Sequence, residues 1–105
     1  MAKASPHTLD QLYAVIQSRR GDDPATSRTA RLFQKGPAKI AQKVGEEAVE
    51  AVIAALAEPR ERLIAESADL LYHLLVLWSA KGVRPDEVWA ELERRAAQPA
   101  TREGG

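Results

Sequence analysis

Apolar residues recur along this chain at helical spacing and predict a series of helices. In the first of them, Leu9 and Leu12 begin a pattern of apolar residues three or four positions apart, which is typical of one face of an amphipathic helix. Thr8 and Gln11 form a capping-box pattern at its start. We expect this helix to end near Arg20, where turn-forming residues follow.

Glycine and proline residues set the bounds of four further predicted helices: 28–34, 37 to about 57, about 60 to 81, and 85 to about 97. Gly36 closes the first of these, and Gly82 suits the left-handed position that follows a helix. No strand pattern competes, so the sequence predicts an all-α fold, a helical bundle of about five helices. We expect residues 1–105 to form a single domain, with an ordered core at about 8–97 and a disordered C-terminal tail.

Acidic residues occur at helical spacing in the two longest predicted helices. Glu46, Glu47 and Glu50 lie in VGEEAVEAVIAAL. Glu66 and Asp69 lie in AESADLLYHLLVLW. Steps of three or four residues place carboxylates on one helix face. Two such faces brought together form a nest of oxygens that repels itself without a cation. Oxygen ligands without sulfur favour Mg²⁺, or Mn²⁺ as a substitute, over zinc.

On the helix predicted from residue 37, a polar stripe about 100° wide adjoins an apolar one. Its members are Lys39, Lys43, Glu46, Glu47 and Glu50, and the apolar residues are Val49, Val52, Ile53 and Leu56. A solvated face with pairs such as Lys43–Glu47, each contributing about 0.2–0.5 kcal/mol, explains the stripe as well as a metal site does.

On the helix predicted over about 60 to 81, Asp69 and His73 lie within about 60° of Glu66 around the helix axis. Most other positions are apolar, so we expect this helix to be buried nearly all round. Asp69 is then a buried acid that needs a cation. A salt bridge from Asp69 to an arginine or lysine is the structural alternative. His73 is either a hydrogen-bonded core histidine or a polar group that supports a ligand or contacts the substrate.

A basic segment precedes the acidic residues. Between residues 24 and 45 every charged side chain is a cation: Arg28, Arg31, Lys35, Lys39 and Lys43. Arg19 and Arg20 lie just upstream. A basic segment that leads into an acidic helix indicates a polyanion held beside a metal, and therefore chemistry on a phosphate ester or anhydride.

Overall composition narrows the function less than these local patterns do. Acidic and basic residues balance at 15 each, so net charge says nothing about a partner. We expect a small-molecule nucleotide substrate and no nucleic-acid partner. The chain has no cysteine, which excludes disulfides, a thiolate nucleophile and a Cys-type zinc site. No apolar run looks long enough to span a bilayer and no secretory signal is apparent, so we expect a cytoplasmic protein without a membrane partner.

The order Glu-x-x-Glu, a gap between helices, then Glu-x-x-Asp resembles the MazG-like all-α nucleoside-triphosphate pyrophosphatases. The phrases KIAQKVGEEAVE and SADLLYHLLVL resemble more closely the phosphoribosyl-ATP pyrophosphohydrolase family of histidine biosynthesis. The matching stretches cover most of residues 9–95. This family usually reads Ser-Tyr-Thr-Ala where the present chain reads Ser27-Arg28-Thr29-Ala30, which leaves the role of Arg28 open.

The resemblance implies Mg²⁺-dependent hydrolysis of phosphoribosyl-ATP to phosphoribosyl-AMP and pyrophosphate, the second step of histidine synthesis. It implies four metal ligands: Glu47, Glu50, Glu66 and Asp69. Glu46 is then free to orient water or take its proton, a role that Glu47 can also fill. The residues expected to contact the substrate are Lys39, Lys43, Arg19, Arg20, Arg31, Lys35 and His73. A homodimer packed through the long central helices is also implied.

Two other functions fit the same residues. One is a house-cleaning nucleotide pyrophosphatase, with the same metal nest and a different base pocket. The other is a non-catalytic helical dimerisation module with an acidic face, which predicts neither metal dependence of stability nor release of pyrophosphate.

Overall fold

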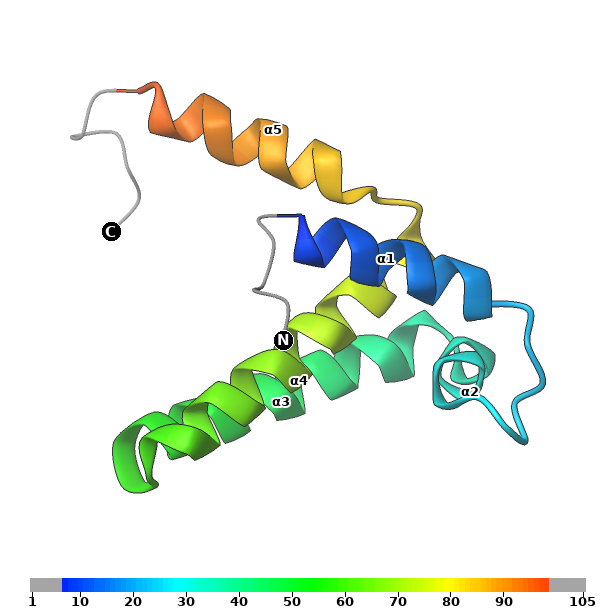
Figure 1. The fold of residues 1–105 in the computed structure, drawn as a ribbon, viewed down its shortest axis with the longest axis horizontal. Coiled ribbons are helices and arrows are strands. Elements are labelled where there is room, and N and C mark those ends of the chain that lie inside the picture. The colour runs from blue at the N-terminus through cyan, green and yellow to red at the C-terminus, as the bar shows by residue number, and fades with distance from the viewer. Residues whose placement is uncertain (1–6, 99–105) are drawn as a thin grey trace, which may run out of the picture.

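The computed structural model describes residues 7–98, and every regular element in that range is a helix (Figure 1). The elements are α1 (Thr8–Arg19), α2 (Arg28–Lys35), α3 (Pro37–Ala57), α4 (Arg60–Lys81) and α5 (Pro85–Ala96). The prediction of an all-α fold with five helices is confirmed, and the helix bounds agree to within a residue or two. Nearly all of the tail predicted to be disordered lies outside the described residues.

Helices α3 and α4 form a long antiparallel hairpin that dominates the molecule (Figure 1). Pro59 forces the reversal between them because its backbone is extended and it cannot continue α3. The hydrophobic core lies at one end of this hairpin, where α1 and α2 pack against it. It is formed by Ile16, Leu32, Ile40, Leu75 and Val76. The other end of the hairpin, near the α3–α4 turn, extends beyond this core.

Local sequence explains most of the helix ends. Ser27 caps α2 by accepting a hydrogen bond from the Ala30 amide at 3.1 Å. Gly36 and Gly82 adopt positive φ values of 91° and 72° at the junctions after α2 and α4, which favours glycine at both positions. The predicted capping box at Thr8 is wrong. Helix α1 includes Thr8 as its first residue, and no side-chain hydrogen bond caps it.

Three contacts of aromatic side chains hold α5 and the loop before it against α1 and α4. The Trp89 ring meets the Trp78 ring edge-on, with centroids 5.9 Å apart, and Trp89 Nε1 donates to Asp10 at 2.9 Å. Tyr13 donates its hydroxyl hydrogen to the Val83 carbonyl at 2.9 Å. The rest of α5 diverges from α1 and from the hairpin (Figure 1).

The expectation that α4 is buried nearly all round is wrong for the single chain. Ile64 and Leu71 are exposed on α4, and so is the whole apolar stripe of α3, where Leu56 is 84% exposed. The reason is geometric: two helices in a hairpin cover only one face of each other. The chain therefore presents a continuous apolar surface on the part of the hairpin that the core does not reach.

Helix α4 is also long and apolar enough, by length and hydropathy alone, to cross a membrane. The expectation that no apolar run reaches this length is therefore wrong, because residues 63–80 carry only two charged side chains, Glu66 and Asp69. One face of α4 nevertheless packs on α3 and carries the buried polar residues Glu66 and His73, as a core helix of a helical domain does.

Candidate functional site

Three carboxylates from the two hairpin helices meet at its middle. One oxygen from each of Glu47 on α3 and Glu66 and Asp69 on α4 lies within 4.8 Å of the others. We call these three residues the acidic cluster. Glu47 is 6% exposed and Glu66 is 5% exposed, although both are acids. The hairpin places them there because the i, i+3 step from Glu66 to Asp69 faces the polar stripe of α3.

The burial of individual acids differs from the expectation. Asp69, expected to be the buried acid, lies outside the buried set, whereas Glu47 and Glu66 lie within it. The difference arises because α4 turns the Glu66 side chain toward α3, while the Asp69 side is not fully covered in the single chain. The structure thus brings three of the four predicted ligands into one cluster.

Glu50, the fourth predicted ligand, lies beside the cluster. It is exposed, and it shares a pocket of about 120 Å³ with Glu66, Glu58, Ile53 and Arg62. Burial raises the pKa of the Glu66 carboxyl above its usual value, and the charges of Glu50 and Asp69 raise it further. A site that holds these acids at close range is therefore short of positive charge.

The buried oxygens of the cluster fit a hard divalent cation. Glu47 Oε2 and Glu66 Oε2 are buried and have no hydrogen-bond partner among residues 7–98. Buried carboxylate oxygens without partners are costly, and carboxylate oxygens are the ligands that Mg²⁺ and Mn²⁺ prefer. Glu47, Glu66 and Asp69 are consequently the residues suited to hold such an ion, with Glu50 close enough to Glu66 to join them.

Two cations already touch the cluster. Arg62 donates to Glu66 Oε1 at 2.7 Å from one turn earlier on α4. Lys43 Nζ lies 3.8 Å from Glu47 and 3.6 Å from Glu46, so the Lys43–Glu47 pair considered from the sequence is present. Each cation contacts one oxygen of a cluster glutamate, and the second oxygen of Glu47 and of Glu66 has no hydrogen-bond partner among the described residues.

Glu46 is in a different environment from Glu47. It accepts a hydrogen bond from Gln42 at 2.9 Å, and its side chain is 48% exposed. The Gln42 hydrogen bond is the main cause that holds the pKa of Glu46 below its usual value, and Lys43 lowers it further. A carboxylate with a lowered pKa is a weaker base than a carboxylate at the ordinary value.

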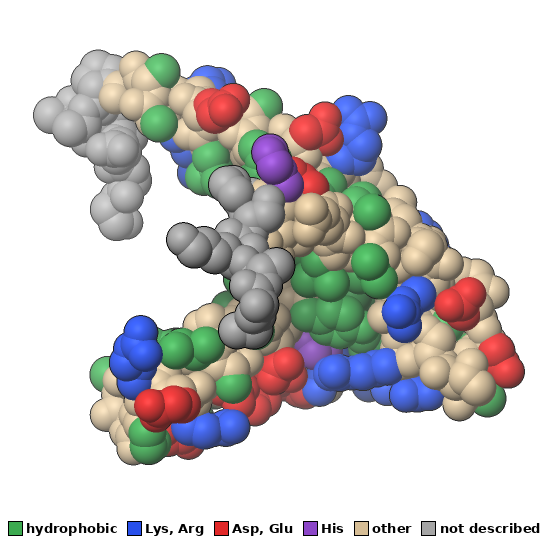
Figure 2. All heavy atoms as spheres, viewed as in Figure 1, with side chains coloured by type: hydrophobic (Ala, Val, Ile, Leu, Met, Phe, Trp, Pro, Cys, Tyr) green, Lys and Arg blue, Asp and Glu red, His purple; other side chains and the backbone are tan. Residues whose placement is uncertain are grey.

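A basic pocket of about 250 Å³ adjoins the acidic cluster. We call it the α2 pocket; it is lined by Arg28, Arg31, Leu32, Lys35, Lys43 and His73. Among the described residues, none of its three α2 cations forms an ion pair with a carboxylate. Figure 2 shows acidic side chains meeting basic ones along this edge of the molecule. Cations without acidic partners favour binding of an anion.

His73 links the pocket to the cluster. It is fully buried, and its Nδ1 lies 2.8 Å from the Asp69 carbonyl oxygen. Since a carbonyl only accepts, Nδ1 carries the hydrogen, and the Nε2 of the neutral ring is then an acceptor. Nε2 has no partner. His73 therefore presents an unsatisfied polar atom at the junction of the α2 pocket and the acidic cluster.

Comparison with known proteins identifies the family of this chain. The family model for phosphoribosyl-ATP pyrophosphohydrolase matches residues 9–96. A phosphoribosyl-ATP pyrophosphatase from Rhodospirillum rubrum is 62% identical over 90 residues, which is 86% of this chain and 77% of the relative. Its counterpart from Paramagnetospirillum magneticum is 63% identical over 87 residues, 83% of this chain and 80% of the relative. The one from Azospirillum brasilense is 57% identical over 93 residues, 89% and 84% of the two chains.

The chain belongs to the phosphoribosyl-ATP pyrophosphohydrolase family. The acidic cluster and the α2 pocket are both within the matched residues. Because the match extends from α1 into the last turn of α5, the family assignment applies to the whole helical domain and not to the acidic segments alone.

Arg28, where this family member departs from the usual tyrosine, stacks on an aromatic ring. Its guanidinium carbon lies 5.3 Å from the centre of the Tyr72 ring, and the Tyr72 hydroxyl is hydrogen-bonded to Thr29 at 2.6 Å. Tyr72 in turn meets the His73 ring edge-on. Sequence reasoning left Arg28 open and did not identify Tyr72, because α2 and α4 are brought together only by the tertiary fold.

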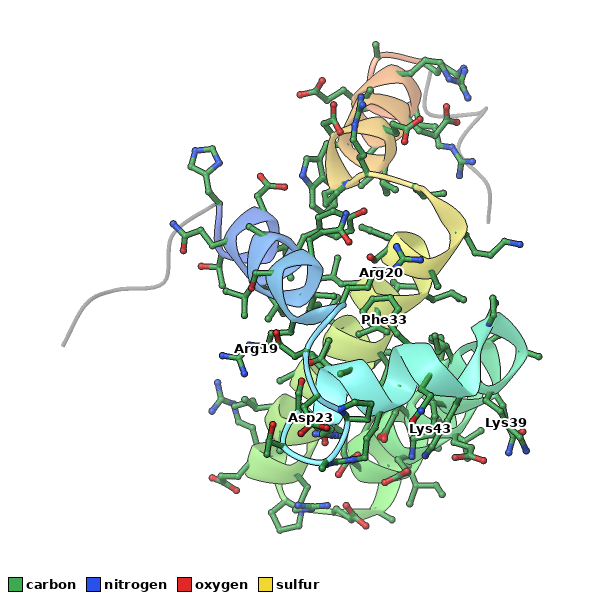
Figure 3. All side chains as sticks on the ribbon, turned by 90° about the vertical axis from the view of Figure 1, so that its right-hand side faces the viewer. Arg19, Arg20, Asp23, Phe33, Lys39 and Lys43 are labelled. Atoms are coloured by element: carbon green, nitrogen blue, oxygen red, sulfur yellow. The ribbon has the colours of Figure 1, made fainter. Side chains whose placement is uncertain are left out.

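Three predicted substrate contacts, Arg19, Arg20 and Lys39, do not line the α2 pocket. Arg20 donates to the Ser79 carbonyl at 3.0 Å and lies over the Phe33 ring at 4.8 Å, so it joins α1 to α2 and α4. Figure 3 shows Arg20 beside Phe33 on one side of α2, and Lys39 and Lys43 on the other.

Sequence reasoning did not identify Arg62 as a residue of the site. Its i, i+4 spacing to Glu66 is a signal that could have identified it.

Proposed function

We propose that this chain hydrolyses phosphoribosyl-ATP to phosphoribosyl-AMP and pyrophosphate, with Mg²⁺ held at the acidic cluster. The observation that supports this most directly is the pair of buried oxygens on Glu47 and Glu66 that have no hydrogen-bond partner among the described residues. They lie beside a pocket whose three α2 cations form no ion pair with any carboxylate of residues 7–98. This arrangement suits a polyphosphate that brings its own negative charge to the α2 pocket and approaches a cation at the cluster.

The ligands in this proposal are Glu47, Glu50, Glu66 and Asp69. When bound, Mg²⁺ would supply charge neutralisation at the phosphates and activation of water. The protein contributes rigid placement, because Glu47 and Glu66 are fixed by burial between two packed helices. Mn²⁺ is the substitute we expect to work, since it accepts the same oxygen ligands.

The α2 pocket holds the polyphosphate chain in this proposal. Arg28 and Arg31 line it from α2, and Lys43 lines it from α3. Arg28 is pre-oriented by its contact with the Tyr72 ring, which lowers the cost of ordering a long side chain on binding. Nε2 of His73 can accept a hydrogen bond from a substrate hydroxyl or from water at the same junction.

Both Glu46 and Glu47 are candidates to orient the attacking water and take its proton. The geometry favours Glu47, whose buried Oε2 is free of hydrogen bonds. Glu46 is held by Gln42 and Lys43, and its pKa is lowered. In this proposal Glu46 chiefly positions Lys43 toward the α2 pocket.

We further propose that two copies pair through α3 and α4 as a cytoplasmic homodimer. The apolar stripe of α3 and residues Ile64 and Leu71 of α4 form an exposed surface of the kind that marks an interface. Light scattering of the wild type should give the mass of two chains. Leu56→Glu should give the mass of one, whereas Leu92→Glu on α5 serves as an exposed apolar control.

A substrate panel tests the proposed reaction against its rival. Pyrophosphate release should be fastest from phosphoribosyl-ATP and much slower from ATP, dCTP and dUTP. Comparable or faster release from an ordinary triphosphate would favour a house-cleaning pyrophosphatase. No release from any of them would favour a helical dimerisation module.

A further inference from the structure

A second basic pocket lies next to the α2 pocket, where α2 ends and α3 begins. We call it the Lys39 pocket; it has a volume of about 480 Å³ and is lined by Lys35, Lys39, Gln42 and Lys43. Lys35 and Lys43 line both pockets. The two are therefore neighbours, separated by a pair of lysines, and one extended ligand can occupy both.

The Lys39 pocket carries more positive charge than its surroundings neutralise. Lys35 and Lys39 form no ion pair with any carboxylate among residues 7–98. The one polar contact of Lys39 in that range is a long one, 3.5 Å to the Gln42 side-chain oxygen. By contrast, Arg62, Arg84 and Arg94 each pair with an acid within their own helix or its cap.

The helix start at this pocket adds to the positive potential. Helix α3 begins at Pro37 with no acidic residue in its first turn and no side-chain cap, yet Lys39 lies in that turn. A lysine at the positive end of a helix dipole is unfavourable by itself. The lysines and the helix end together favour a small dianion such as a phosphate monoester.

The position of Lys39 separates it from the reacting phosphates. It precedes Glu47 by eight residues on α3, which is about 12 Å along the helix axis at about 1.5 Å per residue. Lys43, halfway between them, contacts Glu47 directly. Figure 3 shows Lys39 and Lys43 on the same side of the molecule, with Lys39 nearer the right-hand edge of the view.

We propose that the Lys39 pocket binds the phosphate of the substrate's phosphoribosyl group while the triphosphate occupies the α2 pocket. This inference rests on the proposed function, because phosphoribosyl-ATP carries phosphate at two separate ends. Lys35 and Lys43 lie between the two sites and contact both ends. The pocket thereby distinguishes phosphoribosyl-ATP from ordinary triphosphates, which have no second phosphorylated sugar.

The test compares phosphoribosyl-ATP with ribosyl-ATP, which is the same molecule without the sugar phosphate. The measured quantity is the ratio of the two kcat/KM values. In Lys39→Ala this ratio should fall by about tenfold, the size expected for one charge-assisted phosphate contact. Lys81→Ala, an exposed lysine at the far end of α4, should leave the ratio at the wild-type value.

A ratio that stays at the wild-type value in Lys39→Ala would overturn the proposal, whether both kcat/KM values fall together or neither changes. Equal loss on both substrates would instead place Lys39 at the triphosphate. If the wild type hydrolyses neither substrate, the proposed function itself fails.

Binding of ribose 5-phosphate distinguishes failure of the Lys39 pocket proposal from failure of the proposed hydrolysis, because binding needs no catalysis. Chemical-shift titration with this compound should perturb α3 amides near Lys39 in the wild type and in the inactive variant Asp69→Asn. The perturbation should be lost in Lys39→Ala and kept in Lys81→Ala. Absence of binding to the wild type, or equal binding to all four proteins, would remove the sugar phosphate from this pocket.

Discussion

The guanidinium of Arg62 lies 2.7 Å from the carboxylate of Glu66, one turn further along α4. Glu66 is buried, and its second oxygen has no partner. Arg62 therefore neutralises part of the negative charge of Glu66, a carboxylate that we also propose as a metal ligand. In the metal-free protein it acts as a partial counter-ion, and a bound divalent cation competes with it for Glu66.

Replacing Arg62 should separate these two effects. In Arg62→Gln the metal-free protein should melt at a lower temperature, because Glu66 loses its counter-ion. Mn²⁺ should bind a few-fold more tightly, because competition for the carboxylate is gone. Calorimetric titration with Mn²⁺ and melting curves in EDTA measure the two quantities. The control is Arg94→Gln, which breaks the Glu91 pair on α5 and should not alter Mn²⁺ binding. Weaker Mn²⁺ binding in Arg62→Gln would mean that Arg62 supports the site.

Removing one charge from the acidic cluster should abolish activity and spare the fold. Asp69→Asn keeps the shape of the side chain and removes a proposed ligand that is not buried. We expect kcat to fall by more than about 100-fold, since loss of even an outer partner of a metal ligand costs 10–100-fold. The measurements are pyrophosphate release and the circular dichroism of the same sample. Near-normal turnover in Mg²⁺ would contradict the assignment of Asp69.

Stability of the metal-free protein should depend on pH through Glu66. Its pKa is raised above the usual 4.5, mainly by burial and then by Glu50. Between 4.5 and the raised value the folded state binds a proton that the unfolded state does not, so lowering the pH through this window stabilises the fold. Above it, the charged carboxylate costs stability.

Melting curves in EDTA for the wild type and Glu66→Gln isolate this contribution. The melting temperature of the wild type should rise relative to that of Glu66→Gln as the pH falls toward 4.5. Glu91, whose pKa is lowered to about 2, contributes stability above 4.5 that is lost as the pH falls toward 2, and it does so equally in both proteins. If the difference in melting temperature between the wild type and Glu66→Gln does not vary with pH, the raised pKa of Glu66 is contradicted.

Lys43 should matter more for catalysis than for stability. Its ion pairs with Glu46 and Glu47 are 3.6 and 3.8 Å long, and helix pairs of this kind contribute about 0.3–0.5 kcal/mol. If Lys43 contacts the substrate from the α2 pocket, Lys43→Ala should lose at least about tenfold in kcat/KM. Both values are measured on one variant, with Lys81→Ala as the control. An unchanged kcat/KM would show that Lys43 does not contact the substrate, and Arg28 and Arg31 would then be the residues that bind its phosphates.

The sequence predicted the helices well because their boundaries are local. Pro37, Pro59 and Pro85 each interrupt or start a helix by their own geometry, and Gly82 ends one. It predicted the capping of α1 poorly. Thr8 and Gln11 match the pattern, but the chain enters the helix one residue earlier.

The candidate site was predictable only where the spacing within one helix decides it. Glu66 and Asp69 share a face by periodicity alone, and so do Lys43 and Glu47. Which acids are buried depends on how α3 and α4 pack, so the sequence identified Asp69 as the buried acid, whereas the structure buries Glu47 and Glu66. Arg20 belongs to the structural contacts with Phe33 and Ser79, and nothing in its local sequence distinguishes it from a substrate-binding arginine.

The most direct test of the central claim is pyrophosphate release from phosphoribosyl-ATP by the wild-type protein, followed by ³¹P NMR with Mg²⁺ and then with EDTA. We predict that phosphoribosyl-AMP and pyrophosphate appear in equal amounts, that EDTA stops the reaction and that excess Mg²⁺ restores it. Release of orthophosphate, no release in Mg²⁺, or release that EDTA does not affect would contradict the account.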